Sequence, residues 1–575
     1  VRQFKRNKEK GEKMKKAWWM TTNIYQIYLR SFYDGNNDGI GDILGVKEKL
    51  TYLKNLGIET IWLSPHYDSP MDDNGYDVRD FYQVSKDYGD IKEFKSLIKR
   101  AKELNMKVLI DLVLNHTSDE HQWFKIAKDP LHPLHNKYHD YYIWQKPKYD
   151  ENNLRIRPTR WVSWFGGPTW DYNEATDEYY LHIFSKKMPD LNWRNEDMKN
   201  DMKKIIKYWI DLGVDGFRVD AANHLEKNWD FPDGVPGYEN FSSLPKHHEY
   251  IKELALELFE PFNLLTLGES GGASKEEVRK YVGFNSHEFN LLIHFGHCWA
   301  DTGYTDDLVT GKWSKMSLRV NDIKKSFAHQ YQVVGKEGFN LVYWHNHDQP
   351  RVVSHYGNTE KYHLESAKML AITLYFMPGT AIVYQGEEIG MTNVLYEKIE
   401  DFRDVEVFTE YHNMLERGAD EERVLQALRD RSRDNARSPM QWDDSENGGF
   451  SKVTPWIKTN YNYKEINVLK EDKSPDSILN AYRFILNTRV KDSKNIIFGE
   501  ISFINIEDNE SYCYINKGQD KDYLVIANFR DYEIEIALED IDISGFDWFY
   551  GSQVLLSEKM KLAPYSATVY VRNKA

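Results

Sequence analysis

Short apolar runs alternate with amphipathic stretches between about residue 22 and residue 390. Eight of the runs are rich in β-branched and aromatic residues, which predicts buried strands. They begin at Asn23, Thr60, Lys107, Gly216, Asn263, Phe289, Leu341 and Thr380. Between several of them, segments such as IKEFKSLIKRAKELN space apolar residues three and four positions apart, which predicts helices with a charged outer face. Eight strands alternating with helices predict an α/β fold of the (β/α)8 barrel type.

Two insertions interrupt this alternation, and a different pattern follows it. Residues 117–187, after the third strand, are rich in Trp, Tyr, Pro and Asp without a helical period, which predicts an inserted subdomain at the barrel rim. The predicted barrel therefore comprises 17–116 and 188–494, with a polar helical insertion at 391–460. From residue 495 to residue 575, strands follow one another without helices, which predicts a C-terminal antiparallel β-sandwich.

The N-terminal residues, the apolar runs and the cysteines bear on the location of the protein. Residues 1–16 carry eight Lys or Arg but no apolar stretch follows, so we expect a disordered basic tail, not a secretory signal, with Met14 as a candidate start. No run of 18 apolar residues occurs, so no transmembrane helix is expected. The two cysteines, Cys298 and Cys513, lie far apart, which excludes a disulfide framework. A reducing, cytoplasmic location is the resulting expectation.

Charge and aromatic content narrow the class of partner. A formal net charge of −15 disfavours nucleic acid and anionic membranes, since both attract basic surfaces. The aromatic content of 14% permits stacking on sugar rings, although a large aromatic core would account for it equally well. We expect a small neutral substrate and a monomer.

Polar residues stand where the predicted strands end, which is where a (β/α)8 barrel carries its active site. A single such residue could be structural, but several buried ionisable groups on one rim are costly unless they are paired or used. The strand-end groups are Asp111, Asn115, His116, Arg218, Asp220, Glu269, His347 and Asp348.

Two of these carboxyl groups suit the two tasks of glycosidic bond cleavage, proton donation and nucleophilic attack. Arg218 lies two residues before Asp220 and so on the same face of the strand, where it would keep Asp220 ionised. Glu269 ends an apolar run, which favours a raised pKa and a role as general acid. The separation of the two groups, about 5 Å for retention and longer for inversion, is not set by the sequence.

The motifs DLVLNH, GFRVDAANH, LLTLGES and VYWHNHDQPR resemble the four core motifs of the α-amylase family of glycoside hydrolases (family 13). RDNARSPMQWDD and YQGEEIGMTN further resemble its oligo-1,6-glucosidase branch, and the resemblance runs from about Trp18 to the C-terminus. It implies a retaining, exo-acting α-glucosidase in which Asp220 is the nucleophile, Glu269 the acid/base and Asp348 the stabiliser of the distorted sugar.

The same resemblance implies a subsite for the non-reducing glucose of an oligosaccharide or disaccharide. Its residues would be Tyr76, Asp77, His116, Phe165, Phe184, Arg218, His347 and Arg433. Tyr76 would stack on the sugar, and Arg433 would pair with Asp77 and close the pocket behind it. For Tyr76, Phe165 and Phe184, ordinary core packing is the alternative.

The segment DGNNDGIGD offers oxygen ligands at every second position, as a hard cation requires. The ligands would be Asp34, Asn36, Asp38, the Ile40 carbonyl and Asp42. No Glu follows at the twelfth position, so the loop is not an EF-hand. The resemblance implies a structural Ca²⁺, and a metal-free Asp/Asn/Gly turn is the alternative.

Three positions bear on the linkage. Ala221 follows the predicted nucleophile where strict α-1,6 enzymes of this branch have Val, which suggests tolerance of α-1,4 or mixed linkages. Met188 opens MPDLN where oligo-1,6-glucosidases have Gln, and Gly271 stands where several relatives place an aromatic.

Other members of the family provide alternatives. Sucrose isomerases carry a basic cluster after the sixth strand that this chain lacks, which disfavours isomerisation. Hydrolysis of sucrose, of its linkage isomers or of trehalose 6-phosphate stays open, although the last needs a phosphate pocket that the sequence does not reveal. Inactive relatives that serve as transporter subunits need a transmembrane helix and have lost the acids, so that role is disfavoured.

Overall fold

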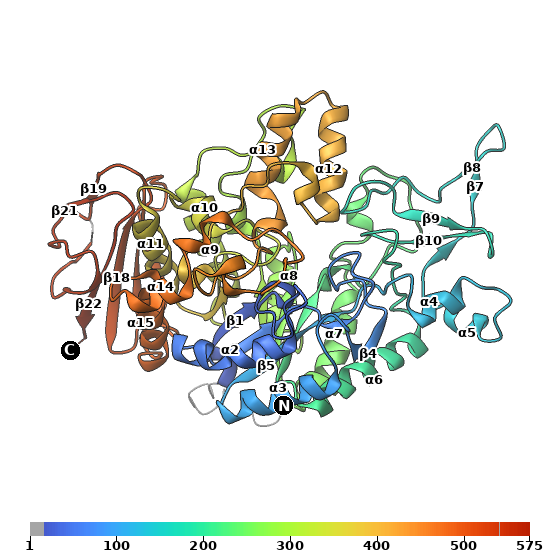
Figure 1. Ribbon diagram of the computed structural model, residues 1–575, viewed down its shortest axis with the longest axis horizontal. Helices are drawn as coiled ribbons and strands as arrows, with labels where there is room; N and C mark the ends of the chain where they lie inside the picture. Colours follow the sequence, from blue (N-terminus) through green and yellow to red (C-terminus); the bar gives the residue numbers. More distant parts are fainter. Residues whose placement is uncertain (1–16, 540, 575) are drawn as a thin grey trace.

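The computed structural model describes residues 17–539 and 541–574, and the basic tail expected at residues 1–16 lies outside that range. The barrel occupies the middle of the molecule (Figure 1). The β-rich C-terminal region lies at one end, and the segment that carries β7 to β10 lies at the other.

Eight parallel strands form the barrel wall, in the order β13-β12-β11-β5-β2-β1-β15-β14. They are β1 (Asn23–Ile27), β2 (Thr60–Leu63), β5 (Lys107–Val113), β11 (Gly216–Asp220), β12 (Leu265–Glu269), β13 (Leu291–Ile293), β14 (Leu341–Val342) and β15 (Thr380–Tyr384). The Tyr343 hydroxyl donates to the His294 carbonyl and so joins the segments that follow β14 and β13, the two end strands of the ladder. All eight strands fall in the predicted runs, and the predicted (β/α)8 barrel is confirmed.

Amphipathic helices surround these strands, and α3 (Ile91–Glu103) shows why they form. Asp90 caps its first turn in a capping box with Glu93, which satisfies backbone N–H groups that have no partner inside the helix. Phe94, Leu97 and Ile98 face inward at helical spacing, as the sequence predicted. The other long helices of the barrel are α2 (Ile43–Leu56), α6 (Glu196–Leu212), α9 (Val320–Val334), α11 (His363–Tyr375) and α15 (Ile478–Lys491).

The segment after β5 forms small elements of its own at the far end of the molecule from the C-terminal sheets (Figure 1). They are helices α4 (Gln122–Ala127) and α5 (His135–His139), the sheet β6 (Trp144–Gln145), β10 (Glu178–Leu181) and β9 (Trp170–Asn173), and the hairpin β7 (Lys148–Tyr149) and β8 (Arg155–Ile156). The two helices have six and five residues, which is too short to show a period in the sequence. We call residues 117–187 the inserted segment below.

The polar segment near residue 400 contains α12 (Val405–Glu416) and α13 (Glu421–Arg431), which pack around Met414 and Leu428. After α15 the chain forms an antiparallel sheet of β16 (Glu500–Ile504), β17 (Ser511–Lys517), β18 (Lys521–Asn528), β22 (Ala567–Asn573) and β20 (Asp547–Gly551).

The strands β19 (Ile534–Ala537) and β21 (Lys559–Leu562) form a second layer over this sheet. The other face of the sheet contacts the barrel, where the Tyr514 hydroxyl donates to the Thr373 carbonyl at 2.9 Å. Strand β20 has no buried residue and its pairing with β22 shifts register between Trp548 and Tyr550. The structure therefore has the expected antiparallel C-terminal sandwich.

Two further observations concern the chain as a whole. Among the helices of the described residues, none has the length and apolar character needed to cross a membrane. Cys298 and Cys513 are both buried and both free.

Candidate active site

The guanidinium of Arg218 joins three neighbouring strands at their carboxyl ends. Parallel pairing sets Arg218 opposite Asp111 of β5 and Leu267 of β12. Nη1 of Arg218 lies 2.5 Å from Asp111 and 2.7 Å from Asp220, and Nη2 lies 2.7 Å from Glu269. The Arg218 side chain has no exposed surface, so all three contacts act in a medium from which water is largely excluded. The predicted nucleophile and acid/base are thereby held on one cation.

Because three carboxylates share the Arg218 guanidinium, Arg218 does not simply keep Asp220 ionised, as the sequence suggested. Burial raises the pKa of Asp220 well above its ordinary value, Arg218 opposes that rise, and the negative charges of Glu269, Asp111 and Asp348 add to it. One guanidinium cannot neutralise three carboxylates. The negative charge left over on this group of carboxylates is part of what raises the pKa of Asp220.

Asp220 and Glu269 are also linked through the backbone. The N–H of Ala221, the residue after Asp220, donates to Oε2 of Glu269 at 3.2 Å. Ala221 has φ 46°, in the left-handed region, and this turn directs its N–H across to β12. The contact places the two carboxyl groups close together at the barrel mouth.

Asp348 lies in a different electrostatic environment, after β14. It contacts Arg437 at 3.0 Å, Arg433 at 3.4 Å and His347 at 3.2 Å. Burial alone would raise its pKa, but His347, Arg433 and Arg437 together hold the pKa of Asp348 below its usual range. Asp348 is therefore ionised at any ordinary pH. Arg437 was not among the predicted site residues, although it stands four residues after Arg433 in the RDNAR motif.

Tyr76, His116 and His347 form one connected group. The Tyr76 ring stacks on His347 with centroids 5.5 Å apart, and its hydroxyl lies 2.6 Å from Nε2 of His347. Nε2 of His116 lies 3.2 Å from the Tyr76 carbonyl. Burial lowers the pKa of each histidine to about 3. Both imidazoles are therefore neutral at pH 7 and present one donor and one acceptor each.

The predicted pairing of Arg433 with Asp77 is wrong. Arg433 instead makes a two-pronged ion pair with Asp404, with distances of 2.6 Å from Nε and 2.5 Å from Nη2, and approaches Asp73 at 3.7 Å. Asp77 accepts hydrogen bonds from the Ser69 hydroxyl and from backbone N–H groups of residues 72 and 73. Asp404 is the N-cap of α12, and nothing in its sequence context marked it as a site residue.

The two predicted aromatic residues of the inserted segment reach the same place. Phe165 and Phe184 have ring centroids 5.5 Å apart. Phe184 meets the ring of His116 at 5.4 Å, and the Arg433 guanidinium lies 5.4 Å from the Phe165 centroid. The inserted segment thus contacts both the barrel and the residues after α13, and ring and cation contacts connect the predicted residues other than Asp77 into one neighbourhood.

Comparison with known proteins agrees with this geometry. Residues 26–498 match the family model described as alpha amylase, catalytic domain. The chain belongs to the alpha-amylase family. It is 42% identical to an oligo-1,6-glucosidase of Bacillus cereus, over 97% of this chain and 100% of that protein.

Solved structures of family members share the whole fold. A trehalose-6-phosphate hydrolase of Bacillus licheniformis superposes with a TM-score of 0.90 at 38% identity, and the match covers 97% of this chain and all of that one. An isomaltulose synthase of Klebsiella superposes with a TM-score of 0.90 at 35% identity, with the same coverage. One backbone thus supports several named activities in this family, so the substrate must be argued from side chains.

Two of the positions expected to set the linkage, Gly271 and Met188, have different surroundings in the structure. A Cβ at Gly271 would meet open space, so this position is free to carry a larger side chain beside Glu269. Trp164 of the inserted segment is 40% exposed and stacks on Tyr238 with ring centroids 4.2 Å apart. Met188 is only 1% exposed in the barrel core, so it acts through packing, not through direct contact with a sugar.

The predicted cation loop is ordered by hydrogen bonds to its own carboxylates. Asp34 accepts backbone N–H groups from residues 37 to 39, and Asp42 accepts those of Gly35, Asn36 and Gly45 while capping α2. Burial raises the pKa of Asp42 to about 6, and the negative charge of Asp34 adds to the rise. Across the described residues, no group of three His, Cys, Asp or Glu side chains gathers as a metal site.

Proposed function

We propose that this chain is a retaining, exo-acting α-glucosidase that releases terminal glucose from short oligosaccharides through α-1,6 bonds, α-1,4 bonds or both. One observation carries the proposal: Asp220 and Glu269 share the Arg218 guanidinium, while Asp348 lies apart on Arg433 and Arg437. The names of the relatives, including the oligo-1,6-glucosidase of Bacillus cereus, support it.

The two carboxyl groups held on Arg218 divide the chemistry between them. Asp220 attacks the anomeric carbon as a carboxylate while Glu269 gives its proton to the leaving oxygen, which breaks the glycosidic bond and forms a glucosyl ester. Glu269 then takes a proton from water, which attacks the same carbon and releases Asp220. The N–H contact of Ala221 with Glu269 supports the short carboxyl separation, about 5 Å, that retention requires.

Asp348 and the neutral histidines serve the sugar itself. A carboxylate that stays ionised beside the site stabilises the positive charge that develops on the ring in the transition state. His116 and His347, neutral at pH 7, can hydrogen-bond hydroxyl groups without adding a charge. Arg433, fixed by Asp404 and covered by Phe165, closes one side of the glucose subsite, which supports release of single terminal residues.

The linkage is tested by a substrate panel of maltose, isomaltose, sucrose, isomaltulose, trehalose and trehalose 6-phosphate. Glucose release from isomaltose or maltose with the highest kcat/KM supports the proposal. The second candidate, hydrolysis of trehalose 6-phosphate, has the Bacillus licheniformis neighbour in its favour. A kcat/KM for trehalose 6-phosphate far above the others would replace the first proposal with the second.

We also propose that the loop from Asp34 to Asp42 binds Ca²⁺ in a structural role. The buried pair of Asp34 and Asp42 supports this, because a cation would offset their mutual repulsion and would add oxygen ligands from Asn36, Asp38 and the Ile40 carbonyl. Metal analysis of Asp38→Ala against the parent protein tests it: equal metal content would reject the site. The two free, buried thiols support a reducing, cytoplasmic location, and we propose a monomer.

A further inference from the structure

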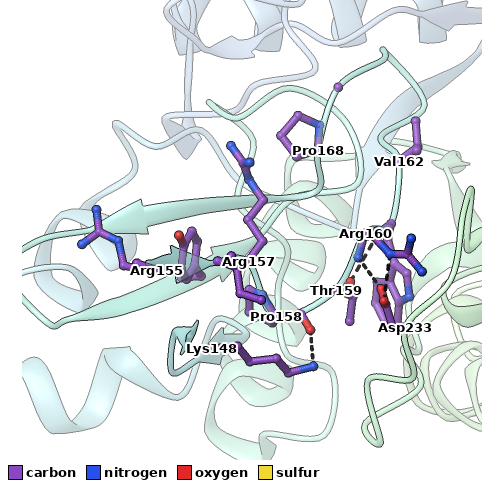
Figure 2. A pocket seen from close by; sticks show the side chains of 13 residues that line it. Lys148, Arg155, Arg157, Pro158, Thr159, Arg160, Val162, Pro168 and Asp233 are labelled. Atoms are coloured by element: carbon purple, nitrogen blue, oxygen red, sulfur yellow. Dashed lines mark hydrogen bonds and ion pairs between the residues drawn. The ribbon is translucent and has the colours of Figure 1, made fainter. Parts of the chain in front are cut away.

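A second hollow lies outside the catalytic centre, on the inserted segment. It has a volume of about 620 Å³ and is shaped by the β7–β8 hairpin, the residues after it, and Asp233 from the loop after β11 (Figure 2). The lining residues are Lys148, Arg155, Ile156, Arg157, Pro158, Thr159, Arg160, Trp161, Val162, Gly167, Pro168, Tyr179 and Asp233. None of the three catalytic acids is among them. We call this hollow the hairpin pocket.

The hairpin pocket is basic on a chain that is acidic overall. Four lining residues carry positive charge and one carries negative charge, whereas the whole chain has a formal net charge of −15. Asp233 is paired with Arg160. Nε of Arg160 donates to one Asp233 carboxylate oxygen at 2.8 Å, and the backbone N–H of Arg160 donates to the other at 2.8 Å. The charges of Lys148, Arg155 and Arg157 are left without a carboxylate inside the pocket.

The contacts of these three cations leave most of their donors available. Lys148 donates to the Pro158 carbonyl, and Arg157 uses only Nε, which donates to the Trp170 carbonyl at 3.0 Å. Arg155 lies over the Tyr172 ring with its guanidinium carbon 3.4 Å from the centroid. Within residues 17–539 and 541–574, none of the three makes an ion pair, although the charge of Arg157 is close enough to help lower the pKa of Asp171. Figure 2 shows Arg157 extending toward Pro168, with Lys148 and Arg160 on the other sides of the hollow.

Apolar surface lies directly beside these charges. Ile156, Pro158 and Trp161 line the same hollow, and Pro158 and Trp161 are buried at its base. Free guanidinium N–H groups match the planar oxygen pairs of a phosphate, and the apolar wall matches the carbon skeleton of an organic phosphate. A neutral sugar would leave the three charges without a counterpart.

We propose that the hairpin pocket binds a phosphate monoester of a small sugar. An aromatic cluster that includes Trp161 and Tyr179 on the pocket side and Phe184 on the active-site side separates the two sites. The proposed ligand is therefore not the substrate, and the proposal does not depend on the proposed α-glucosidase activity.

Binding in the hairpin pocket would affect a loop that also reaches the rim of the active site. The loop that carries Asp233 also accepts a hydrogen bond from Trp161 at the Pro232 carbonyl, and the same loop supplies Tyr238, which stacks on Trp164. An anion that competes with Asp233 for Arg160 acts on this loop. The site thus offers a route by which a sugar phosphate changes KM without entering the glucose subsite.

The experiment is calorimetric titration of the full chain with glucose 6-phosphate, inorganic phosphate and glucose at low ionic strength. We expect saturable one-site binding of glucose 6-phosphate, weaker binding of phosphate, and none of glucose. The double variant Arg155→Ala/Arg157→Ala should bind glucose 6-phosphate at least about tenfold more weakly, since it loses the charge-assisted hydrogen bonds of two guanidinium groups.

A matched control removes two positive charges from the same segment outside the pocket. Lys125→Ala/Lys146→Ala should keep the parent affinity, because neither residue lines the hollow. Equal binding of glucose 6-phosphate by the arginine double variant and the parent would overturn the proposal, and so would equal losses in the two double variants, which would indicate net charge alone. Absence of saturable binding to the parent would also overturn it.

Discussion

The active site contains two arginine–carboxylate centres that are built in opposite proportions. Around Arg218, one guanidinium faces three carboxylates, Asp111, Asp220 and Glu269. Around Asp348, one carboxylate faces two guanidinium groups, those of Arg433 and Arg437. The first centre has an excess of negative charge, which favours retention of a proton, and the second has an excess of positive charge, which favours its loss.

This difference teaches how acids of the same chemical type acquire different tasks in one site. Burial raises the pKa of Asp220, and the charges of the neighbouring carboxylates raise it further, although Arg218 opposes the rise. The pKa of Asp348 lies below its usual range despite burial, so it carries a permanent charge. Both carboxyl groups are buried, so the ratio of guanidinium groups to carboxylates, and not burial alone, accounts for the raised pKa of Asp220 and the lowered pKa of Asp348.

The largest expected effect comes from removing the attacking acid of the first centre. Asp220→Asn should lower kcat/KM for an aryl α-glucoside by on the order of 10⁴-fold or more, because the amide cannot form the glucosyl ester. Initial rates and a thermal unfolding curve measure the outcome. The control Asp215→Asn alters a partly exposed acid paired with Lys107 and should keep nearly full activity. Activity within tenfold of the parent would remove Asp220 from the mechanism.

Replacing the shared cation, Arg218, should have the next largest effect on activity. Arg218→Lys keeps the positive charge but cannot reach Asp220 and Glu269 with two separate N–H groups, so we expect a loss of about 10²–10³-fold in kcat. Activity across the pH range measures it. A parent-like rate would show that the fork geometry at Arg218 is not needed.

The second centre is tested by pH. Arg437→Gln removes one of the two cations, so the pKa of Asp348 should rise toward its ordinary value of about 4. Because Asp348 must be ionised to stabilise the sugar, the acid limb of the kcat profile should move to higher pH. A profile identical to that of the parent would separate Asp348 from Arg437 in function.

The corrected partner of Arg433 can be checked by a double-mutant cycle. Asp404→Asn combined with Arg433→Gln should show a coupling free energy of about 1–3 kcal/mol in kcat/KM, as expected for groups in one ion-pair network. The matched cycle of Asp77→Asn with Arg433→Gln should show a smaller value. The reverse order would restore the pairing with Asp77 that the sequence suggested.

The smallest effect concerns the linkage. Ala221→Val should shift the ratio of isomaltose to maltose hydrolysis upward by a few fold, and it should also cost about 1–3 kcal/mol of stability, since Ala221 has a left-handed backbone that β-branched residues avoid. Ala221→Gly, which relieves the backbone without filling space, is the control. An unchanged ratio in Ala221→Val would reject a role for this position in linkage choice.

The sequence predicted the parts of the molecule that repeat a local pattern. The eight barrel strands were predicted because each buried strand is a continuous apolar run, and Asp220 and Glu269 were proposed as catalytic because each ends such a run. Asp404 and Arg437 could not be placed in this way, since their contacts with Arg433 and Asp348 join segments that are distant in the chain. The arrangement of charges, including the three acids on Arg218, depends on strand register and appears only in three dimensions.

The excess of negative charge around Arg218 supports a double displacement in which Asp220 is the nucleophile. The most direct test is mass spectrometry of peptides from enzyme quenched during turnover of a slow, fluorinated α-glucosyl substrate. The account predicts a covalent glucosyl group on the peptide that contains Asp220, together with glucose released first as the α-anomer. A glucosyl group on the peptide of Glu269, or release of the β-anomer without any adduct, would contradict it.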